Sequence, residues 1–182
     1  MKKTIFFAVL VAFLFTTGLT NAQSKMKLGV GAFVGLPMGT FGDITSIGFG
    51  GAVQGEYNMG DKLVGTLTTG YTLFSGKDVS GIKMGDWSII PIMVGGKYFF
   101  AQNIYGTVQA GLNMVSYKIP ATTYTFFGAT VTTPEQTLNE TEFGYAIGVG
   151  YDMGQFDISA KYGTFATDAS YLGVTALYKF GL

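Results

Sequence analysis

The chain has 182 residues, of which 12% are charged, 48% are hydrophobic and 28 are glycine, and its formal net charge at pH 7 is zero. Soluble domains carry about 25% charged residues, so this composition argues against a protein that faces water on all sides. The absence of Cys, His and Arg excludes disulfides, thiolate or imidazole catalysis and the usual zinc sites, and it leaves no basic surface for nucleic acid. We therefore expect no catalytic activity, no cofactor, no metal site and no nucleic-acid partner.

The first 22 residues have the pattern of an export signal. Lys2 and Lys3 supply the positive start, an apolar run extends from Ile5 to Phe15, and the small residues of Thr20-Asn21-Ala22 follow. This run is too short for a membrane-spanning helix, which needs about 20 residues. We predict a cleavable signal peptide over residues 1–22 and one domain over residues 23–182.

Apolar residues in the rest of the chain alternate with small or polar ones, as in Leu28, Val30 and Ala32. A period of two is typical of β-strands. The pattern predicts eight strands, at 26–36, 47–58, 62–74, 87–100, 103–117, 140–152, 155–164 and 170–182. Strands would then form most of the domain, far above the 20 to 25% of an average globular protein, and this favours a closed barrel.

The predicted connections alternate in length. Short turns rich in Gly, Asn and Asp lie at 58–61, 101–103 and 152–155, and longer links lie at 37–46, 75–86, 118–139 and 165–169. Outer-membrane barrels are built in this way, with the short turns facing the periplasm.

The two faces of the predicted strands differ in charge. One phase of every strand is free of Lys, Asp and Glu, whereas the other phase contains the charged residues among Gly, Thr and Gln. A Lys facing lipid at the bilayer midplane costs about 2 to 4 kcal/mol, so the uncharged face must be the outer one. Aromatic residues near both ends of the strands predict two girdles at the membrane interfaces.

Three segments resemble the small outer-membrane β-barrel proteins of Gram-negative bacteria, the porin-like group that includes OmpA-type transmembrane domains. These segments are Ile90 to Phe100, Phe143 to Tyr151 and Gly173 to Leu182. The expected fold is all-β, an eight-stranded antiparallel up-and-down transmembrane β-barrel after a cleavable signal peptide. The resemblance implies an outer-membrane location, contact with the lipid bilayer and recognition of the C-terminal strand by the barrel-assembly machinery, although the chain ends on Leu182 where such barrels usually have an aromatic residue.

Inward charges of both signs gather near the short turns. Because unpaired ions are costly in a narrow lumen, we predict that they pair across strands and close the barrel, with Gln109 and Asn113 continuing the polar network upward. The predicted charge network consists of Lys27, Glu56, Lys97, Asp157, Lys161 and Lys179.

The link at 118–139 is the best candidate for a specific role. It contains Tyr124, Phe126 and Phe127 among threonines, and exposed aromatic residues suit adhesion or partner binding. It is either a hairpin above the membrane or a plain extension of the adjoining strands. The leading interpretation is a structural or surface-interaction barrel that binds an extracellular protein or surface ligand through its loops.

Two alternatives remain open. The first is a narrow channel for small solutes, suggested by the inner face of the third strand with Thr66, Thr68, Gly70 and Thr72. The second is a secreted, soluble, lipocalin-like binding barrel whose apolar face points inward.

Overall fold

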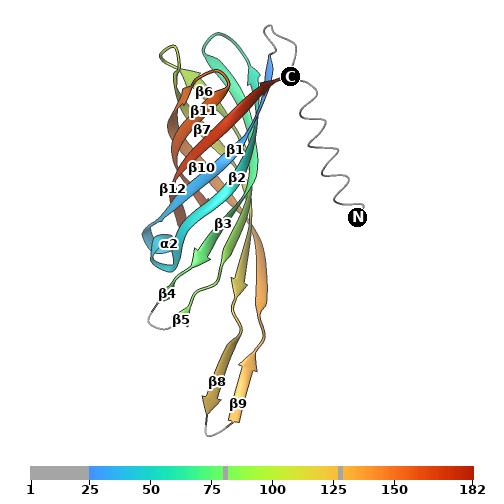
Figure 1. The fold of residues 1–182 in the computed structure, drawn as a ribbon, viewed down its shortest axis with the longest axis vertical. Coiled ribbons are helices and arrows are strands. Elements are labelled where there is room, and N and C mark those ends of the chain that lie inside the picture. Colours follow the sequence, from blue (N-terminus) through green and yellow to red (C-terminus); the bar gives the residue numbers. More distant parts are fainter. Residues whose placement is uncertain (1–24, 80–81, 127–128) are drawn as a thin grey trace, which may run out of the picture.

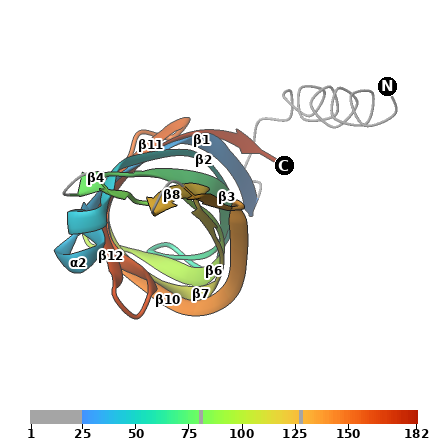
Figure 2. The same cartoon turned by 90° about the horizontal axis from the view of Figure 1, so that it is seen from below.

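The computed structural model describes residues 25–79, 82–126 and 129–182. Its eight long strands are β1 (Met26–Met38), β2 (Thr45–Asn58), β3 (Leu63–Gly76), β6 (Trp87–Phe99), β7 (Ile104–Ile119), β10 (Gln136–Asp152), β11 (Phe156–Ala166) and β12 (Ala169–Gly181). They close into one barrel in the order β1-β12-β11-β10-β7-β6-β3-β2, and every neighbouring pair is antiparallel. Figures 1 and 2 show the closed wall from the side and along its axis. The predicted eight-stranded up-and-down barrel is confirmed, whereas the predicted signal peptide lies outside the described residues and stays a prediction.

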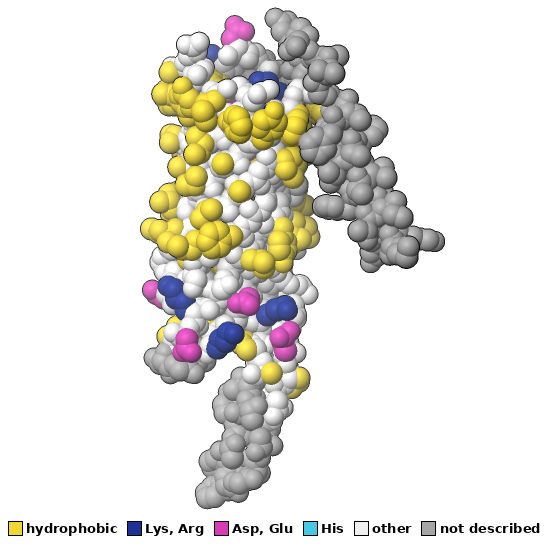
Figure 3. All heavy atoms as spheres, in the orientation of Figure 1, with side chains coloured by type: hydrophobic (Ala, Val, Ile, Leu, Met, Phe, Trp, Pro, Cys, Tyr) yellow, Lys and Arg dark blue, Asp and Glu magenta, His cyan; other side chains and the backbone are white. Residues whose placement is uncertain are grey.

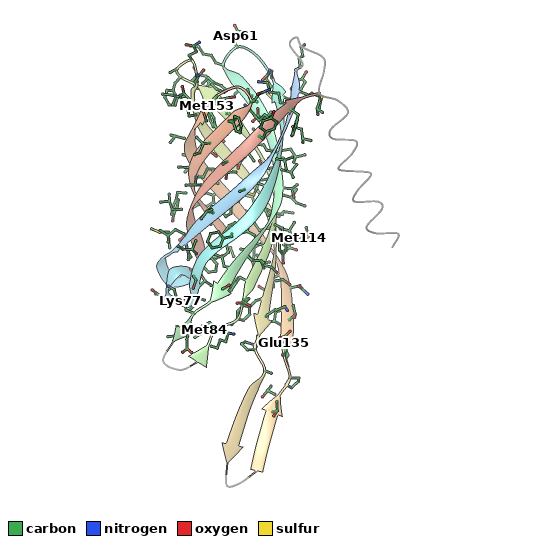
Figure 4. The ribbon with its side chains drawn as sticks, viewed as in Figure 1. Asp61, Lys77, Met84, Met114, Glu135 and Met153 are labelled. Atoms are coloured by element: carbon green, nitrogen blue, oxygen red, sulfur yellow. The ribbon has the colours of Figure 1, made fainter. Side chains whose placement is uncertain are left out.

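The short turns at 58–61, 101–103 and 152–155 lie at one end of the barrel, and the other connections lie at the opposite end (Figure 1). Figure 4 places Asp61 and Met153 at the short-turn end and Lys77, Met84 and Glu135 at the long-link end. The C-terminus also lies at the short-turn end, where the Leu182 amide donates a hydrogen bond of 3.1 Å to the Met26 carbonyl oxygen. The described part of the chain contains no helix long and apolar enough to cross a membrane.

The long links contain structure of their own. The first long link forms the short helix α2 (Gly39–Ile44). The second forms a hairpin of β4 (Asp78–Val79) and β5 (Ile82–Lys83). The third forms a hairpin of β8 (Thr122–Phe126) and β9 (Ala129–Thr133). The link at 118–139 is thus both an extension of β7 and β10 and a separate hairpin. The prediction of a longer link at 165–169 is wrong: Ala166 pairs with Ala169, after a bulge that follows Thr164, so that only two residues reverse the chain.

Outward and inward residues alternate along the wall. Exposed fractions are 63% for Phe49, 61% for Val94 and 64% for Phe143, but only 5% for Glu56 and 2% for Lys97. The apolar face therefore points outward, as predicted, and the lipocalin-like alternative is wrong, because that fold needs its apolar face inside.

Aromatic side chains are exposed on the outer wall towards both ends of the barrel. Figure 3 shows hydrophobic side chains along the wall, densest in two bands. The exposed aromatic residues are Tyr57, Tyr98, Phe100, Tyr151, Phe156 and Tyr178 towards the short turns, and Phe49, Tyr71, Phe143, Tyr145 and Tyr162 towards the long links. Two such bands fit the two interfaces of a bilayer.

The hydrogen-bonded ladder of the wall is interrupted between β3 and β6. These strands pair at Thr69 with Ile92 and again at Thr72 with Ile89, without pairs between, and the register is unchanged across the gap. Pro91 lies in this gap, and proline has no amide hydrogen to donate to a neighbouring strand.

Inside the barrel, aromatic rings lie against glycines of neighbouring strands. Phe74 is completely buried, and a Cβ atom at Gly48 on the adjacent strand would lie 2.5 Å from its ring carbons. Gly150 has the same relation to Tyr105, at 2.2 Å from the ring. An eight-stranded barrel is just wide enough for side chains to fill it, so a large ring requires a missing side chain opposite.

We predict that Gly48→Ala destabilises the barrel by about 1 to 3 kcal/mol, the usual cost of overpacking a filled interior. The free energy of unfolding, measured by urea titration in lipid vesicles, checks this prediction. Gly55→Ala is the matched control on the same strand, because the nearest atom to its new Cβ would be a carbonyl oxygen at 3.9 Å. Equal losses in the two variants would contradict the packing argument.

Candidate functional site

Four charged side chains meet inside the half of the barrel nearest the short turns. The Lys97 ammonium lies 2.6 Å from Glu56 Oε1 and 2.8 Å from Asp157 Oδ2. Lys179 lies 3.5 Å from the other Glu56 oxygen and 3.8 Å from Asp157 Oδ2. Because these residues come from β6, β2, β11 and β12, the ion pairs connect strands across the lumen.

Two residues outside the predicted charge network complete it. Asp152, at the end of β10, also pairs with Lys179. The Tyr105 hydroxyl donates a 2.6 Å hydrogen bond to Asp157 Oδ1, and the Lys97 ammonium lies 4.5 Å from the centre of the Tyr105 ring. A cation over an aromatic face is favourable, so Tyr105 stabilises both members of the Lys97–Asp157 pair.

Lys161 and Lys27 lie apart from the four paired residues. Lys161 Nζ donates to Gln109 Oε1 at 3.3 Å. Lys27 lines an open space of about 840 Å³ at the short-turn mouth, and within the described residues it has no ion pair. The structure therefore separates the six predicted charges into a paired group of four, one side chain further along the lumen and one at the mouth.

A chain of hydrogen bonds links Lys161 to the ion pairs. Gln109 donates to Thr68 Oγ1 at 2.9 Å, Thr68 donates to Gln54 Oε1 at 3.0 Å, and Gln54 donates to Glu56 Oε1 at 2.9 Å. Each donor in this chain points towards Glu56. Asn113 does not join it, because its amide donates to the Phe165 carbonyl oxygen at 3.0 Å.

A cluster of aromatic and aliphatic side chains fills the half of the lumen nearest the long links. We call these residues the aromatic cluster: Phe41, Phe74, Ile89, Val115, Phe165, Ala169 and Tyr171, with Phe33, Trp87 and Ala166 packed against them. Helix α2 contributes Phe41, whose ring centre lies 5.1 Å from that of Phe74 and 5.3 Å from that of Trp87. Phe165 and Tyr171 are stacked at 4.1 Å. The lumen is thus filled at two levels, by ions and by rings.

The remaining predicted site residues lie on the third long link. Tyr124 and Phe126 are in β8, where they pair in register with Val131 and Ala129 of β9. Phe127 lies outside the described residues. No group of three or more acidic side chains that could hold a metal ion occurs in residues 25–79, 82–126 and 129–182.

Comparison with known proteins shows the fold. No protein-family model matches the sequence, and no curated protein matches it. Among solved structures, the attachment invasion locus protein Ail of Yersinia pestis in a nanodisc is 15% identical, with a TM-score of 0.55 over 87% of this chain and 100% of that chain. The N-terminal β-barrel domain of Pseudomonas aeruginosa OprF is 16% identical, with a TM-score of 0.52 over 87% of this chain and 100% of that one. Neisserial surface protein A is also 16% identical, with a TM-score of 0.52 over 89% and 100%.

These barrels share the architecture of this chain over nearly their whole length. The predicted resemblance to small outer-membrane β-barrels is therefore confirmed at the level of the fold. The closed wall and its apolar outer belt suit the same setting, an integral position in the outer membrane.

We predict that Lys97→Met costs about 3 to 5 kcal/mol of stability, because it leaves Glu56 and Asp157 buried with one cation fewer. Adding Glu56→Gln restores charge balance, so the double variant should be more stable than Lys97→Met alone. Unfolding free energies from urea titration in lipid vesicles test this order.

The control is the exposed pair of Lys118 and Glu135, 3.7 Å apart on the third long link. Lys118→Met should cost less than about 1 kcal/mol, as is usual for surface pairs. If the Lys97 and Lys118 variants lose equal stability, the interior ion pairs do not stabilise the barrel.

Proposed function

We propose that this chain, an outer-membrane β-barrel by fold, is a surface-contact protein without catalytic activity. In this proposal, the closed barrel anchors an arm formed by the outer parts of β7 and β10 and by the β8–β9 hairpin. The arm binds an extracellular protein or a surface ligand. The proposal rests on the length of this arm, which extends from a barrel whose lumen is filled by side chains.

The arm continues directly from the barrel wall. β7 and β10 have 16 and 17 residues, against 11 to 14 in the other wall strands. Their register is unbroken from Tyr151 and Ile104 to Gln136 and Ile119, whereas the pairing of β10 with β11 stops at Ala146. The outer part of β10 therefore leaves the barrel with β7 as its partner, and Figure 1 shows the hairpin reaching well beyond the other links.

The composition of the hairpin suits contact with another molecule. The hairpin contains Tyr124 and Phe126 among threonines, and its two strands pair in register. Aromatic residues are enriched where proteins bind one another. The fold neighbour Ail is named the attachment invasion locus protein, so the proposed role is compatible with this fold.

The filled lumen argues against the channel alternative. The inner threonines of β3 do not line an open path, because Thr68 donates to Gln54 and accepts from Gln109. The absence of His and Cys from the sequence supports a role without catalysis. Lipid contact along the apolar belt is part of the proposal, and recognition of the C-terminal strand by the assembly machinery stays a prediction.

We predict that removing the arm abolishes binding but not folding. In the variant, Asn-Gly replaces residues 120–135 and joins Ile119 to its register partner Gln136, because this dipeptide forms two-residue turns between antiparallel strands. Bacteria that display the wild-type barrel should adhere to a panel of immobilised extracellular-matrix proteins, and the variant should not. Heat-shifted gel mobility should show that both are folded.

A shortened β4–β5 hairpin is the matched control and should leave adhesion unchanged. Lys83→Cys should react with a membrane-impermeant maleimide on intact cells, because the long links face outward in this topology, and the chain has no other cysteine. Adhesion that persists without the arm, or an intact barrel that adheres to nothing, would refute the proposal.

We also predict that the wild-type barrel shows no steady conductance in planar lipid bilayers. Glu56→Ala with Asp157→Ala should produce only rare, brief openings, because the aromatic cluster still fills the other half of the lumen. Adding Phe41→Ala should lengthen them. A wild-type barrel that conducts steadily would favour the channel alternative instead.

A further inference from the structure

A small cavity separates the ion pairs from the aromatic cluster. Its volume is about 50 Å³, and it is lined by apolar side chains, among them Phe33, Pro91, Met93, Phe165 and Tyr171, and by the polar side chains of Lys161, Gln109, Asn113, Thr68, Thr72 and Thr175. A single buried water needs roughly 10 to 15 Å³ of such volume. The cavity therefore has room for a small ion with a water molecule beside it.

The side chain of Lys161 lines this cavity, and few protein groups offset its positive charge. Only 8% of the residue is exposed, and its hydrogen bond to Gln109 Oε1, at 3.3 Å, is to a neutral acceptor. Among the described residues, no carboxylate forms an ion pair with Lys161, because the interior carboxylates are paired with Lys97 and Lys179. In the part of the chain that the structure describes, the hydrogen bond to Gln109 is the one that the Lys161 ammonium group donates.

The charge balance of the interior points the same way. The buried charged residues are three lysines, Lys97, Lys161 and Lys179, and two carboxylates, Glu56 and Asp157. Asp152 brings the interior to three lysines and three carboxylates, but its ion pair is with Lys179 at the short-turn end of the barrel. Of the lysines in the described ranges, Lys161 is the buried one without an ion pair, and it lines the cavity.

A second polar group at the cavity also lacks a partner. Asn113 is 1% exposed, and its side-chain oxygen accepts no hydrogen bond. Buried polar atoms in folded proteins are nearly always satisfied, by protein groups or by ordered water. A water molecule can donate to this oxygen, but a water molecule cannot neutralise Lys161.

We propose that the cavity is a binding site for a small monovalent anion of the halide class, held by the Lys161 ammonium group. The anion accepts hydrogen bonds from Lys161 and from the hydroxyls of Thr72 and Thr175, and a water molecule joins it to Asn113. Uncompensated charge inside a protein is costly, so the ion contributes to barrel stability. This site is independent of the contact role proposed for the arm.

The test uses bromide, which scatters X-rays anomalously. The full mature barrel is unfolded in urea and refolded into detergent in sodium bromide, so that the ion is present when the wall closes, and it is then crystallised. We expect an anomalous peak within hydrogen-bond distance of Lys161 Nζ. The thermal unfolding midpoint should also be higher in sodium chloride than in sodium sulfate of equal ionic strength.

Lys161→Met should lose both the peak and the preference for chloride, whereas Lys27→Met, which removes the lysine at the mouth, should keep both. An interior without bromide, or bromide at surface lysines as an adventitious ion only, would overturn the proposal. So would a chloride preference that persists in Lys161→Met. If that variant does not fold, the anomalous map of the wild-type protein alone decides.

Discussion

The lumen of an eight-stranded barrel must be filled by the inward side chains of its own wall, and the rest of this structure depends on that constraint. Lipid outside the wall excludes charge, so ionic groups in the lipid-facing part of the wall are directed inward. Once inside, a charge has neither bulk water nor space, and it needs a partner from another strand. Lys97 meets that need with Glu56 and Asp157, and the pairs join β6 to β2 and β11. Association of distant strands is thus coupled to neutralisation of charge.

The two halves of the lumen solve the filling problem by different chemistry. Near the short turns, ions and amides pair in a connected network. Near the long links, rings such as Phe74 and Phe165 pack edge to face, with Phe41 brought in from helix α2. Filling by ions depends on charge balance, whereas filling by rings depends on shape. A change that loosens one half therefore leaves the other half closed.

Much of the fold could be predicted from the sequence because lipid selects side chains by a simple rule. An uncharged outer phase with a period of two identifies each strand, and the alternation of turn lengths orders them. The interior is harder to predict, because inward rings such as Tyr105 look the same in sequence as outward rings. Phe41 was unpredictable for another reason: its role depends on how a link folds back over the barrel. The sequence did indicate that Glu56, Lys97, Asp157 and Lys179 point inward and carry charges of opposite sign. Lys27 and Lys161 also point inward, and they differ from these four only in their position along the barrel axis. The register between neighbouring strands sets that position.

The interrupted ladder at Pro91 makes the wall mechanically uneven. The seam between β1 and β12, where the two ends of the chain meet, has an unbroken register from Lys27 to Met38. The seam between β3 and β6 lacks pairs at its middle, although both strands lie in the middle of the sequence, far from the chain ends. When a closed barrel is deformed, the largest displacement is expected between the two strands that are most weakly paired. We therefore expect the wall to be more compliant beside Pro91, level with the small cavity that Pro91 helps to line, than at the seam where the chain begins and ends.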